Sequence, residues 1–508
     1  MVDFASLFEG FMALMQLDVL IALVAGTVGG MIIGALPGFS AAMGVSLLIP
    51  ITYGMSSVAA LTMLTAMYTS AIYGGSITAI LCHTPGTPAS AATAIDGYQL
   101  TKQGRGMEAM GVATLGSAVG GTVSAIAMLL IAPALGAFSL KFSVLEYFLL
   151  AVFGLTVIAS LAGDSVVKGM FSGVLGLLLG CVGLDAISGF PRMTLGVMQL
   201  EDGINFVPAL IGLFSVSQVM TLAFDVHSGK TGSVIEDEEN LKKGRALPPW
   251  KELKTLFPTM ARCSIVGTIV GIVPAAGAGV SSWICYSMGK KFSKNPEKFG
   301  HGAMEGVASC ETGNNAATGG ALIPLITLAL PGSTVAAILL GGMMIHGLTP
   351  GATMFTKHAA TTYGIMLGFL FANILMGVIG LVAARYIARV SALPMGVLGP
   401  VITALCAVGT FAIRNNIFDV GVMLVFGVIG FLLKKAGFAA PPMILGMVLS
   451  DICENNWRRA VILAGAKGGM VKYFLGRPIA IVLALLIVVS IFSPIMMNYV
   501  NKKAKSNL

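Results

Sequence analysis

The sequence predicts an all-α polytopic membrane protein built from two inverted-topology repeats, each with a re-entrant hairpin and a discontinuous helix. Three observations predict this fold class. The 508 residues are 56% hydrophobic and only 10% charged, with a mean hydropathy of +0.91, which is typical of a chain that crosses a membrane several times. Proline–glycine pairs interrupt the apolar segments. The interruptions of the first half recur in the same order in the second half.

The clearest interruption is Thr84-Pro85-Gly86, which lies inside an apolar segment. Proline has no amide hydrogen and its ring clashes with the preceding turn, so the helix should break there and free backbone groups. At membrane depth, only protein, water or a ligand can satisfy such groups. The pattern recurs 246 residues later at Pro331-Gly332, and a second motif, Gly30 to Pro37, recurs 237 residues later as Gly267 to Pro274. Two breaks that recur in one order predict a duplicated transport core.

The helices are expected in the apolar segments, because about 20 apolar residues suffice to cross the hydrocarbon core. In the first half these segments are residues 19–50, 58–95, 107–135, 144–161, 166–184 and 206–224. In the second half they are residues 263–288, 302–345, 361–384, 397–411, 417–433, a less clear 442–452, and 478–497.

Loop charges predict that the two halves have opposite orientations. Lys102 and Arg105 follow the first broken helix, whereas no Lys or Arg follows the second one until Lys357. The flanks of the first hairpin are acidic or neutral, and those of the second are basic. Because positive loops favour the cytoplasm, inverted repeats follow. We expect a first repeat at 1–225, a cytoplasmic basic connector at 226–262 and a second repeat at 263–508.

The net charge of +8 reflects this topology, and no nucleic-acid partner is expected. The C-terminal end does not follow the charge rule, since basic residues lie on both sides of the last apolar segment. Those before it are Arg458, Arg459, Lys467, Lys472 and Arg477, and those after it are Lys502, Lys503 and Lys505.

The binding site is expected where the two hairpins, with tips at Pro37 and Pro274, meet the two broken helices. Exposed helix ends present amides to an anion and carbonyls to a cation. Small neutral polar side chains beside the breaks can hold a carboxylate without a buried arginine. They are Ser40, Thr84, Thr87, Asn314, Asn315, Ser333 and Thr334.

Each hydroxyl has a structural alternative, because serine and threonine in membrane helices often bond back to the preceding turn. Asn314 and Asn315 are harder to explain in this way, since two adjacent amides face different sides of a helix and both need partners. His83 could relay a proton or contact substrate. We favour the alternative that it is neutral and bonded to a freed carbonyl.

An enzyme is not expected. Gly229-Lys230-Thr231 resembles the end of a phosphate-binding loop, but Phe224 stands where the leading glycine is required. Gly163-Asp164 beside Lys168 suggests a membrane aspartyl site, yet no matching second aspartate occurs, so a loop charge pair is the better interpretation. The seven cysteines have no C-x-x-C spacing, which argues against a disulfide framework or a metal cluster.

Taken in order and spacing, one series of motifs resembles the large membrane subunit of tripartite tricarboxylate transporters (TctA-like), over essentially the whole chain. The series is Gly34-Ala35-Leu36-Pro37-Gly38, Tyr73-Gly74-Gly75-Ser76-Ile77, Pro85-Gly86, Asp96-Gly97-Tyr98, Asn314-Asn315-Ala316-Ala317, Pro324 and Pro331-Gly332-Ser333.

The resemblance implies a permease subunit of the prokaryotic inner membrane that takes up carboxylates such as citrate. It implies symport driven by sodium, with protons as the alternative, and no other cofactor. The partners would be a small four-helix membrane subunit and a periplasmic substrate-binding protein, and an elevator-like core would move against a scaffold. The resemblance adds Pro85, Gly86, Pro331 and Gly332 to the substrate site, and it assigns ion binding to Pro37, Gly38, Pro274 and Gly277. The alternative is a stand-alone carboxylate exchanger or channel without a binding protein.

Overall fold

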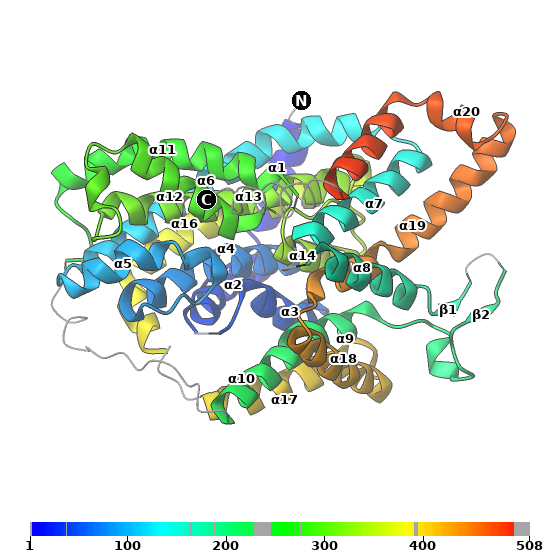
Figure 1. Ribbon diagram of the computed structural model, residues 1–508, viewed down its shortest axis with the longest axis horizontal. Helices are drawn as coiled ribbons and strands as arrows, with labels where there is room; N and C mark the ends of the chain where they lie inside the picture. Colours follow the sequence, from blue (N-terminus) through cyan, green and yellow to red (C-terminus); the bar gives the residue numbers. More distant parts are fainter. Residues whose placement is uncertain are drawn as a thin grey trace, which may run out of the picture.

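The computed structural model describes residues 3–36, 38–161, 165–185, 188–227, 245–274, 276–390 and 395–491 (Figure 1). Within these residues the chain is almost entirely helical, apart from a two-residue antiparallel ribbon of β1 (Gly183–Leu184) and β2 (Pro191–Arg192). Six helices are long and apolar enough to cross a membrane. They span Leu17–Ala35, Gly106–Ser139, Phe206–Phe224, Trp250–Ile272, Ala359–Ile387 and Ile417–Lys435. These helices agree with the predicted all-α polytopic membrane protein.

The first group of elements is a short helix, a helical hairpin, a long helix that breaks, and a second long helix. The elements are α1 (Phe4–Leu14), α2 (Leu17–Ala35), α3 (Ala41–Thr52), α4 (Ser57–Cys82), the 3-10 turn η1 (Pro88–Ser90), α5 (Thr93–Lys102) and α6 (Gly106–Ser139). α4 ends at Cys82, so the break lies where the sequence predicts it, whereas Pro37, the predicted tip of the hairpin, lies outside the described residues.

The second half has a helical hairpin, a long helix followed by a break, and a second long helix in the same order. The elements are α11 (Trp250–Ile272), α12 (Gly277–Phe292), the 3-10 turn η4 (Pro296–Lys298), α13 (Met304–Leu328), α14 (Thr334–Ile345), α15 (Ala352–Thr356) and α16 (Ala359–Val390). Helices of one group pack against helices of the other: α13 lies along α6, and α16 lies along α4.

The remaining elements lie at the right and at the bottom of the view in Figure 1. They are α7 (Val144–Leu161), α8 (Val166–Gly180), the 3-10 turn η2 (Met198–Leu200), α9 (Phe206–Ile211), the π-helical turn η3 (Gly212–Val216), α10 (Ser217–His227), α17 (Met395–Arg414), α18 (Ile417–Lys435), α19 (Ala440–Ala466), α20 (Met470–Leu475) and a last helix, Pro478–Ile491.

Glycines set the closest helix contacts. A Cβ atom at Gly26, Gly30 or Gly34 of α2 would lie within 2.7 Å of a backbone carbonyl oxygen of α4. Gly267 and Gly271 of α11 approach carbonyl oxygens of α13 in the same way, at 2.5 and 2.4 Å. Without side chains at these positions the backbones can touch, as the four-residue glycine spacing indicates.

The turn between α5 and α6 lies beside the ends of the α11–α12 hairpin. Arg105 Nη2 donates to Glu252 Oε2 at 2.8 Å, and Gln103 Nε2 donates to the His301 carbonyl at 2.8 Å. The basic loops of both halves therefore lie at one end of the molecule.

The end of α14 lies beside the ends of the α2–α3 hairpin. His346 Nε2 is 3.2 Å from Thr52 Oγ1, and Ser57 Oγ donates to the His346 carbonyl at 3.4 Å. Ser56 Oγ, in turn, donates to Asp18 Oδ2 at 3.3 Å. Each hairpin is thus flanked by the end of the other group's broken helix.

Two elements differ from the sequence-based expectation. α11 begins at Trp250, so the last part of the expected 226–262 connector is helical. The charged residues there suggest a loop, but Leu253, Leu256 and Met260 form a buried stripe that packs against α6 and α13. The less clear segment 442–452 is part of α19, a 27-residue helix. The C-terminal half of α19 contains charged residues, so the apolar segment in the sequence is shorter than the helix.

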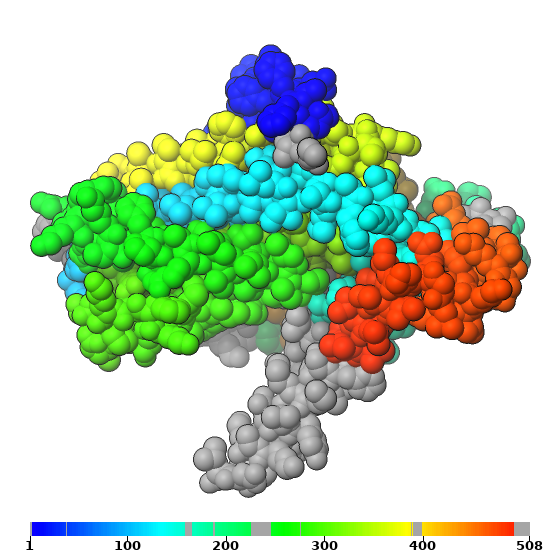
Figure 2. Space-filling view, turned by 90° about the horizontal axis from the view of Figure 1, so that it is seen from above, coloured from blue at the N-terminus to red at the C-terminus, as the bar shows by residue number. Residues whose placement is uncertain are grey.

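α1 projects from the rest of the molecule and rests on α16 (Figure 2). A Cβ atom at Gly10 would lie 2.6 Å from the amide nitrogen of Gly364, so only glycine permits this contact. The Asp3 amide donates to Tyr363 Oη at 3.1 Å.

Candidate functional site

The two broken helices end in the same left-handed turn. α4 is followed by His83 with φ +54°, and α13 is followed by Ala329 with φ +56°, 246 positions later. The amide after each cap donates to a carbonyl six residues earlier, at 3.3 Å in the first break and 3.1 Å in the second. Pro85 and Pro331 follow two residues beyond each cap, where they prevent the helix from resuming. The sequence prediction of two matching breaks is confirmed at this local level.

A glycine in each break touches the hairpin of its own group. A Cβ atom at Gly86 would lie 2.1 Å from the carbonyl oxygen of Gly34 at the end of α2. A Cβ atom at Gly332 would lie 2.7 Å from the carbonyl oxygen of Gly271 near the end of α11. The C-terminal end of the first helix of each hairpin therefore contacts the unwound segment of its own group.

The tip of the second hairpin lies near both breaks. Gly277 has φ +59°, and a Cβ atom built on it would lie 3.7 Å from Ser333 Cβ in the second break. A Cβ atom on Gly279 would lie 3.9 Å from the Pro88 carbonyl oxygen in the first break. Pro274 lies half-buried in the turn before this tip. One hairpin tip thus brings the two breaks together.

The first hairpin tip contacts other elements. Pro37 lies outside the described residues. Gly38 is exposed with φ +83°, and its carbonyl accepts a hydrogen bond from Gln218 Nε2 of α10 at 2.6 Å. Gln218 Oε1 accepts in turn from Lys434 Nζ of α18 at 2.8 Å. The ion-binding role of Pro37, Gly38, Pro274 and Gly277 stays a prediction.

Most of the hydroxyl groups predicted for the site also bond to nearby backbone. Ser40 Oγ and Ser333 Oγ cap α3 and α14 by accepting from backbone amides at 3.2 and 3.1 Å. Thr84 Oγ1 donates to the Cys82 carbonyl at 3.1 Å. The Thr87 amide donates to the Ser90 hydroxyl at 3.4 Å, but the hydroxyl of Thr87 itself is buried without a hydrogen-bond partner in the described structure. Thr334 is half-buried at the start of α14.

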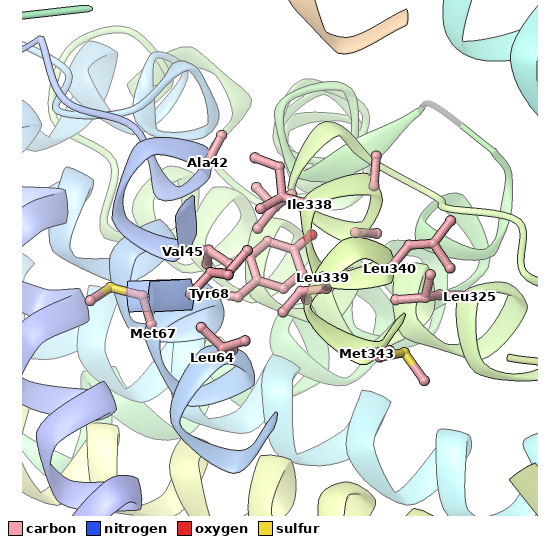
Figure 3. Packing of buried hydrophobic residues seen from close by; sticks show 14 of the residues in the cluster. Ala42, Val45, Leu64, Met67, Tyr68, Leu325, Ile338, Leu339, Leu340 and Met343 are labelled. Atoms are coloured by element: carbon pink, nitrogen blue, oxygen red, sulfur yellow. The ribbon is translucent and has the colours of Figure 1, made fainter. Parts of the chain in front are cut away.

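Ser333 has a second contact, which comes from the other group. Its Oγ lies 3.0 Å from Tyr68 Oη of α4, and both side chains are buried. Figure 3 shows the Tyr68 ring projecting from α4 toward α14, near Val45 and Leu339. This contact links the long helix of the first group to the break of the second.

The two adjacent asparagines face different partners, as expected. Asn315 Nδ2 donates to Thr69 Oγ1 at 3.0 Å and to the Thr69 carbonyl at 3.2 Å. Thr69 Oγ1 donates to Asn373 Oδ1 of α16 at 2.7 Å. Thr69 and Asn315 are 246 positions apart, so equivalent positions of the two groups contact each other across their interface. Asn314 Nδ2 donates instead to Glu311 Oε1 at 3.1 Å.

Glu311 is a buried acid to which the sequence analysis assigns no role. Its side chain is 0% exposed and accepts from Thr93 Oγ1 of α5, from Ser117 Oγ of α6 at 3.0 Å, and from Asn314. One signal could have indicated it, because Glu311 is the only acidic residue between positions 306 and 418. An acid in so long an apolar stretch indicates function by default.

His83 is exposed at the first break, and its ring stacks on Tyr98 with centroids 4.7 Å apart. Lys102 Nζ lies 4.7 Å from the centre of the same tyrosine ring. The favoured expectation that His83 bonds to a freed carbonyl is therefore not met in the described structure, where the ring stacks on Tyr98 instead.

A cavity of about 470 Å³ adjoins the second break. Its lining includes Leu328 and Ala329 at the end of α13, with Asn456 and Arg459 from α19.

The site contains helix ends, neutral amides and hydroxyls, which suit binding of an anion better than bond cleavage. Among the described residues no group of three His, Cys, Asp or Glu side chains could hold a metal ion. Asp164 and the Gly229-Lys230-Thr231 segment, which the enzyme alternatives need, lie outside the described residues.

Comparison with known proteins gives a consistent result. Residues 20–445 match the model of the "Tripartite tricarboxylate transporter TctA family". The "Uncharacterized 52.8 kDa protein in TAR-I ttuC' 3'region" of Agrobacterium vitis is 38% identical over 460 residues, covering 90% of this chain and 89% of that protein. A protein from the TAR-II ttuC' 3'region of the same organism is 36% identical over 214 residues, 42% of this chain and 87% of that protein. No solved structure matches this chain.

Proposed function

Because the chain belongs to the tripartite tricarboxylate transporter TctA family, we propose that it drives ion-coupled uptake of tricarboxylates or related carboxylates as the large transmembrane subunit. In this proposal it works in a prokaryotic inner membrane with a small four-helix membrane subunit and a periplasmic substrate-binding protein. The coupling ion is sodium, with protons as the alternative.

The observation that carries the proposal is the meeting of two unwound segments at one hairpin tip. Both breaks place non-helical backbone next to small polar side chains, and the tip of the α11–α12 hairpin lies beside Ser333 in one and beside Pro88 in the other. Helix ends that converge in this way form an anion site without a fixed positive charge. We assign carboxylate binding to Thr84, Thr87, Asn314 and Ser333, with the adjoining proline–glycine pairs.

The contacts at the two ends of the molecule support inverted repeats. The end of the first broken helix lies beside the ends of the second hairpin, through Arg105 and Glu252. The end of the second broken helix lies beside the ends of the first hairpin, through His346 and Thr52. We therefore propose repeats at 1–225 and 263–508 in opposite orientations, with the connector and the basic loops in the cytoplasm.

We also propose that the transporter works as an elevator, in which a core moves against a scaffold. The moving core would contain both hairpins and both broken helices, and α7 to α10 with α17 to α19 would form the scaffold. The hydrogen bond from Gln218 to the Gly38 carbonyl then joins the core to the scaffold and must break when the core moves.

The test is uptake into proteoliposomes of radiolabelled citrate and other carboxylates, with both partner subunits present or absent and with an inward sodium gradient imposed or collapsed. We expect uptake to need the gradient and the partners. Uptake without the partners would indicate a stand-alone exchanger or channel, and no uptake of any carboxylate would contradict the proposed substrate class.

Variants then test the site. Replacing Asn314 or Ser333 by alanine removes a hydrogen bond to a charged substrate, which is worth about 1.5–3 kcal/mol, so uptake at low substrate should fall about 10- to 100-fold. Ser139→Ala is the matched control, because the hydroxyl of this buried serine donates to the Gly136 carbonyl of its own helix. Normal uptake in both site variants, at equal membrane insertion, would refute the site assignment.

A further inference from the structure

Glu311 carries a carboxylate in the interior that only neutral groups surround. Its oxygens accept from Thr93 of α5, Ser117 of α6 and Asn314 of α13. In the described part of the chain no Lys, Arg or His forms an ion pair with it. The titratable side chains there that interact with it electrostatically are Tyr73 and Cys310, neither of which supplies a positive charge.

An isolated ionised carboxylate in such a place is strongly disfavoured. Hydrogen bonds from neutral donors reduce this cost but do not cancel the charge. Glu311 must therefore either take up a proton or share its site with a cation.

A second observation favours a metal cation. Asn314 Oδ1, on the side chain that donates to Glu311, is buried without a hydrogen-bond partner in the described structure. The hydroxyl oxygen of Thr312, the residue after Glu311, is also buried without a hydrogen-bond partner there. A buried carbonyl oxygen is almost always satisfied, so an orphan beside a carboxylate indicates a missing positive partner.

The available donors are all oxygens. A carboxylate, an amide oxygen and the hydroxyls of Thr93 and Ser117 match the ligands that hard cations prefer. We propose that Glu311, Asn314, Thr93 and Ser117 bind the coupling sodium ion. The role of this ion in driving uptake rests on the proposed function. Sodium binding at these residues can be tested without transport.

The placement explains how ion and substrate would be linked. Asn314 is also a proposed carboxylate contact, so a bare Glu311 would repel an incoming carboxylate in a medium of low dielectric constant. Sodium at Glu311 removes that repulsion and fixes the Asn314 side chain. The ion should therefore bind before the substrate, and each should increase the affinity for the other.

The first experiment measures binding of ²²Na⁺ to the purified full-length chain, without partners or carboxylates, and its melting temperature in NaCl or KCl at equal ionic strength. We expect saturable sodium binding and a higher melting temperature in sodium than in potassium. Glu311→Gln should lower sodium binding at least tenfold and abolish the difference between the salts. Ser117→Ala keeps the Glu311 carboxylate and should also weaken sodium binding. It provides the test if the Glu311→Gln variant fails to fold.

Glu305→Gln is the matched control. Glu305 lies on the same helix and also accepts from two hydroxyls, Thr259 Oγ1 and Ser293 Oγ, both at 2.6 Å, yet it lies outside the proposed site. Its variant should bind sodium like the wild type. No sodium binding by the wild type, a melting temperature that responds to acid but not to sodium, or normal binding by Glu311→Gln would each overturn the proposal. A chain that binds sodium but takes up no carboxylate would keep this site and refute the proposed function.

Discussion

Replacing Gly86 by alanine tests the contact that positions the first break. The added Cβ atom would lie 2.1 Å from the Gly34 carbonyl oxygen and 2.8 Å from Gly75 Cα. Non-bonded carbon atoms prefer separations of about 3.5–4.0 Å, so the break must move away from α2 by about 1 Å. Both neighbours are backbone atoms and cannot rotate aside. Overpacking of this kind costs about 1–3 kcal/mol, and we expect a loss near the upper end.

The assay is thermal unfolding of the purified protein in detergent, followed by uptake in proteoliposomes. Gly332→Ala, at the equivalent position, has a milder approach of 2.7 Å to the Gly271 carbonyl oxygen and should lose less stability. Gly421→Ala is the control, because nothing lies within 4 Å of its Cβ position and alanine favours the helix by about 0.5–1 kcal/mol. If Gly86→Ala melts as high as Gly421→Ala, the close approach of break and hairpin does not exist.

Three further substitutions test other contacts by the same unfolding assay. Asp96→Asn weakens an acceptor that holds three backbone amides before α13 at 2.8, 2.9 and 3.0 Å, so stability should fall by about 1–3 kcal/mol; an unchanged melting temperature would contradict that role. Tyr68→Phe removes the hydroxyl that meets Ser333, with an expected loss of about 0.5–1.5 kcal/mol, and equal stability would show that the contact contributes nothing. Arg477→Gln leaves Glu146, which is 0% exposed, without its ion-pair partner, and should cost about 2 kcal/mol after allowing for the partial exposure of the arginine. A variant as stable as wild type in low salt would refute the pairing.

The breaks could be predicted from sequence because proline acts locally. Pro85 and Pro331 prevent helix continuation whatever surrounds them, and their recurrence at a fixed spacing separates a designed break from an accidental kink. The caps at His83 and Ala329 were not predictable in the same way. Histidine adopts a left-handed backbone more often than most residues but still rarely, and alanine does not favour it, so packing around the break must impose it.

The environment of Glu311 could not be predicted, because it depends on contacts across the sequence. Its hydroxyl donors lie 218 and 194 positions away, on α5 and α6. The same holds for the basic residues near the C-terminus that conflict with the charge rule. Arg458 and Arg477 form ion pairs with Asp185 and Glu146, so a count of positive residues overstates the free charge at that end. Lys502, Lys503 and Lys505 lie outside the described residues.

The two groups of helices have matching breaks but differ in the side chains at one pair of equivalent positions. Tyr68 and Asn314 occupy equivalent positions, 246 residues apart on α4 and α13. The tyrosine is large, fills the space toward α14 and satisfies its hydroxyl on Ser333. The asparagine is small, and its amide oxygen is buried without a partner in the described structure. Of these two equivalent positions, one is therefore hydrogen-bonded within the protein, and the other carries an acceptor that no hydrogen bond in the described structure uses.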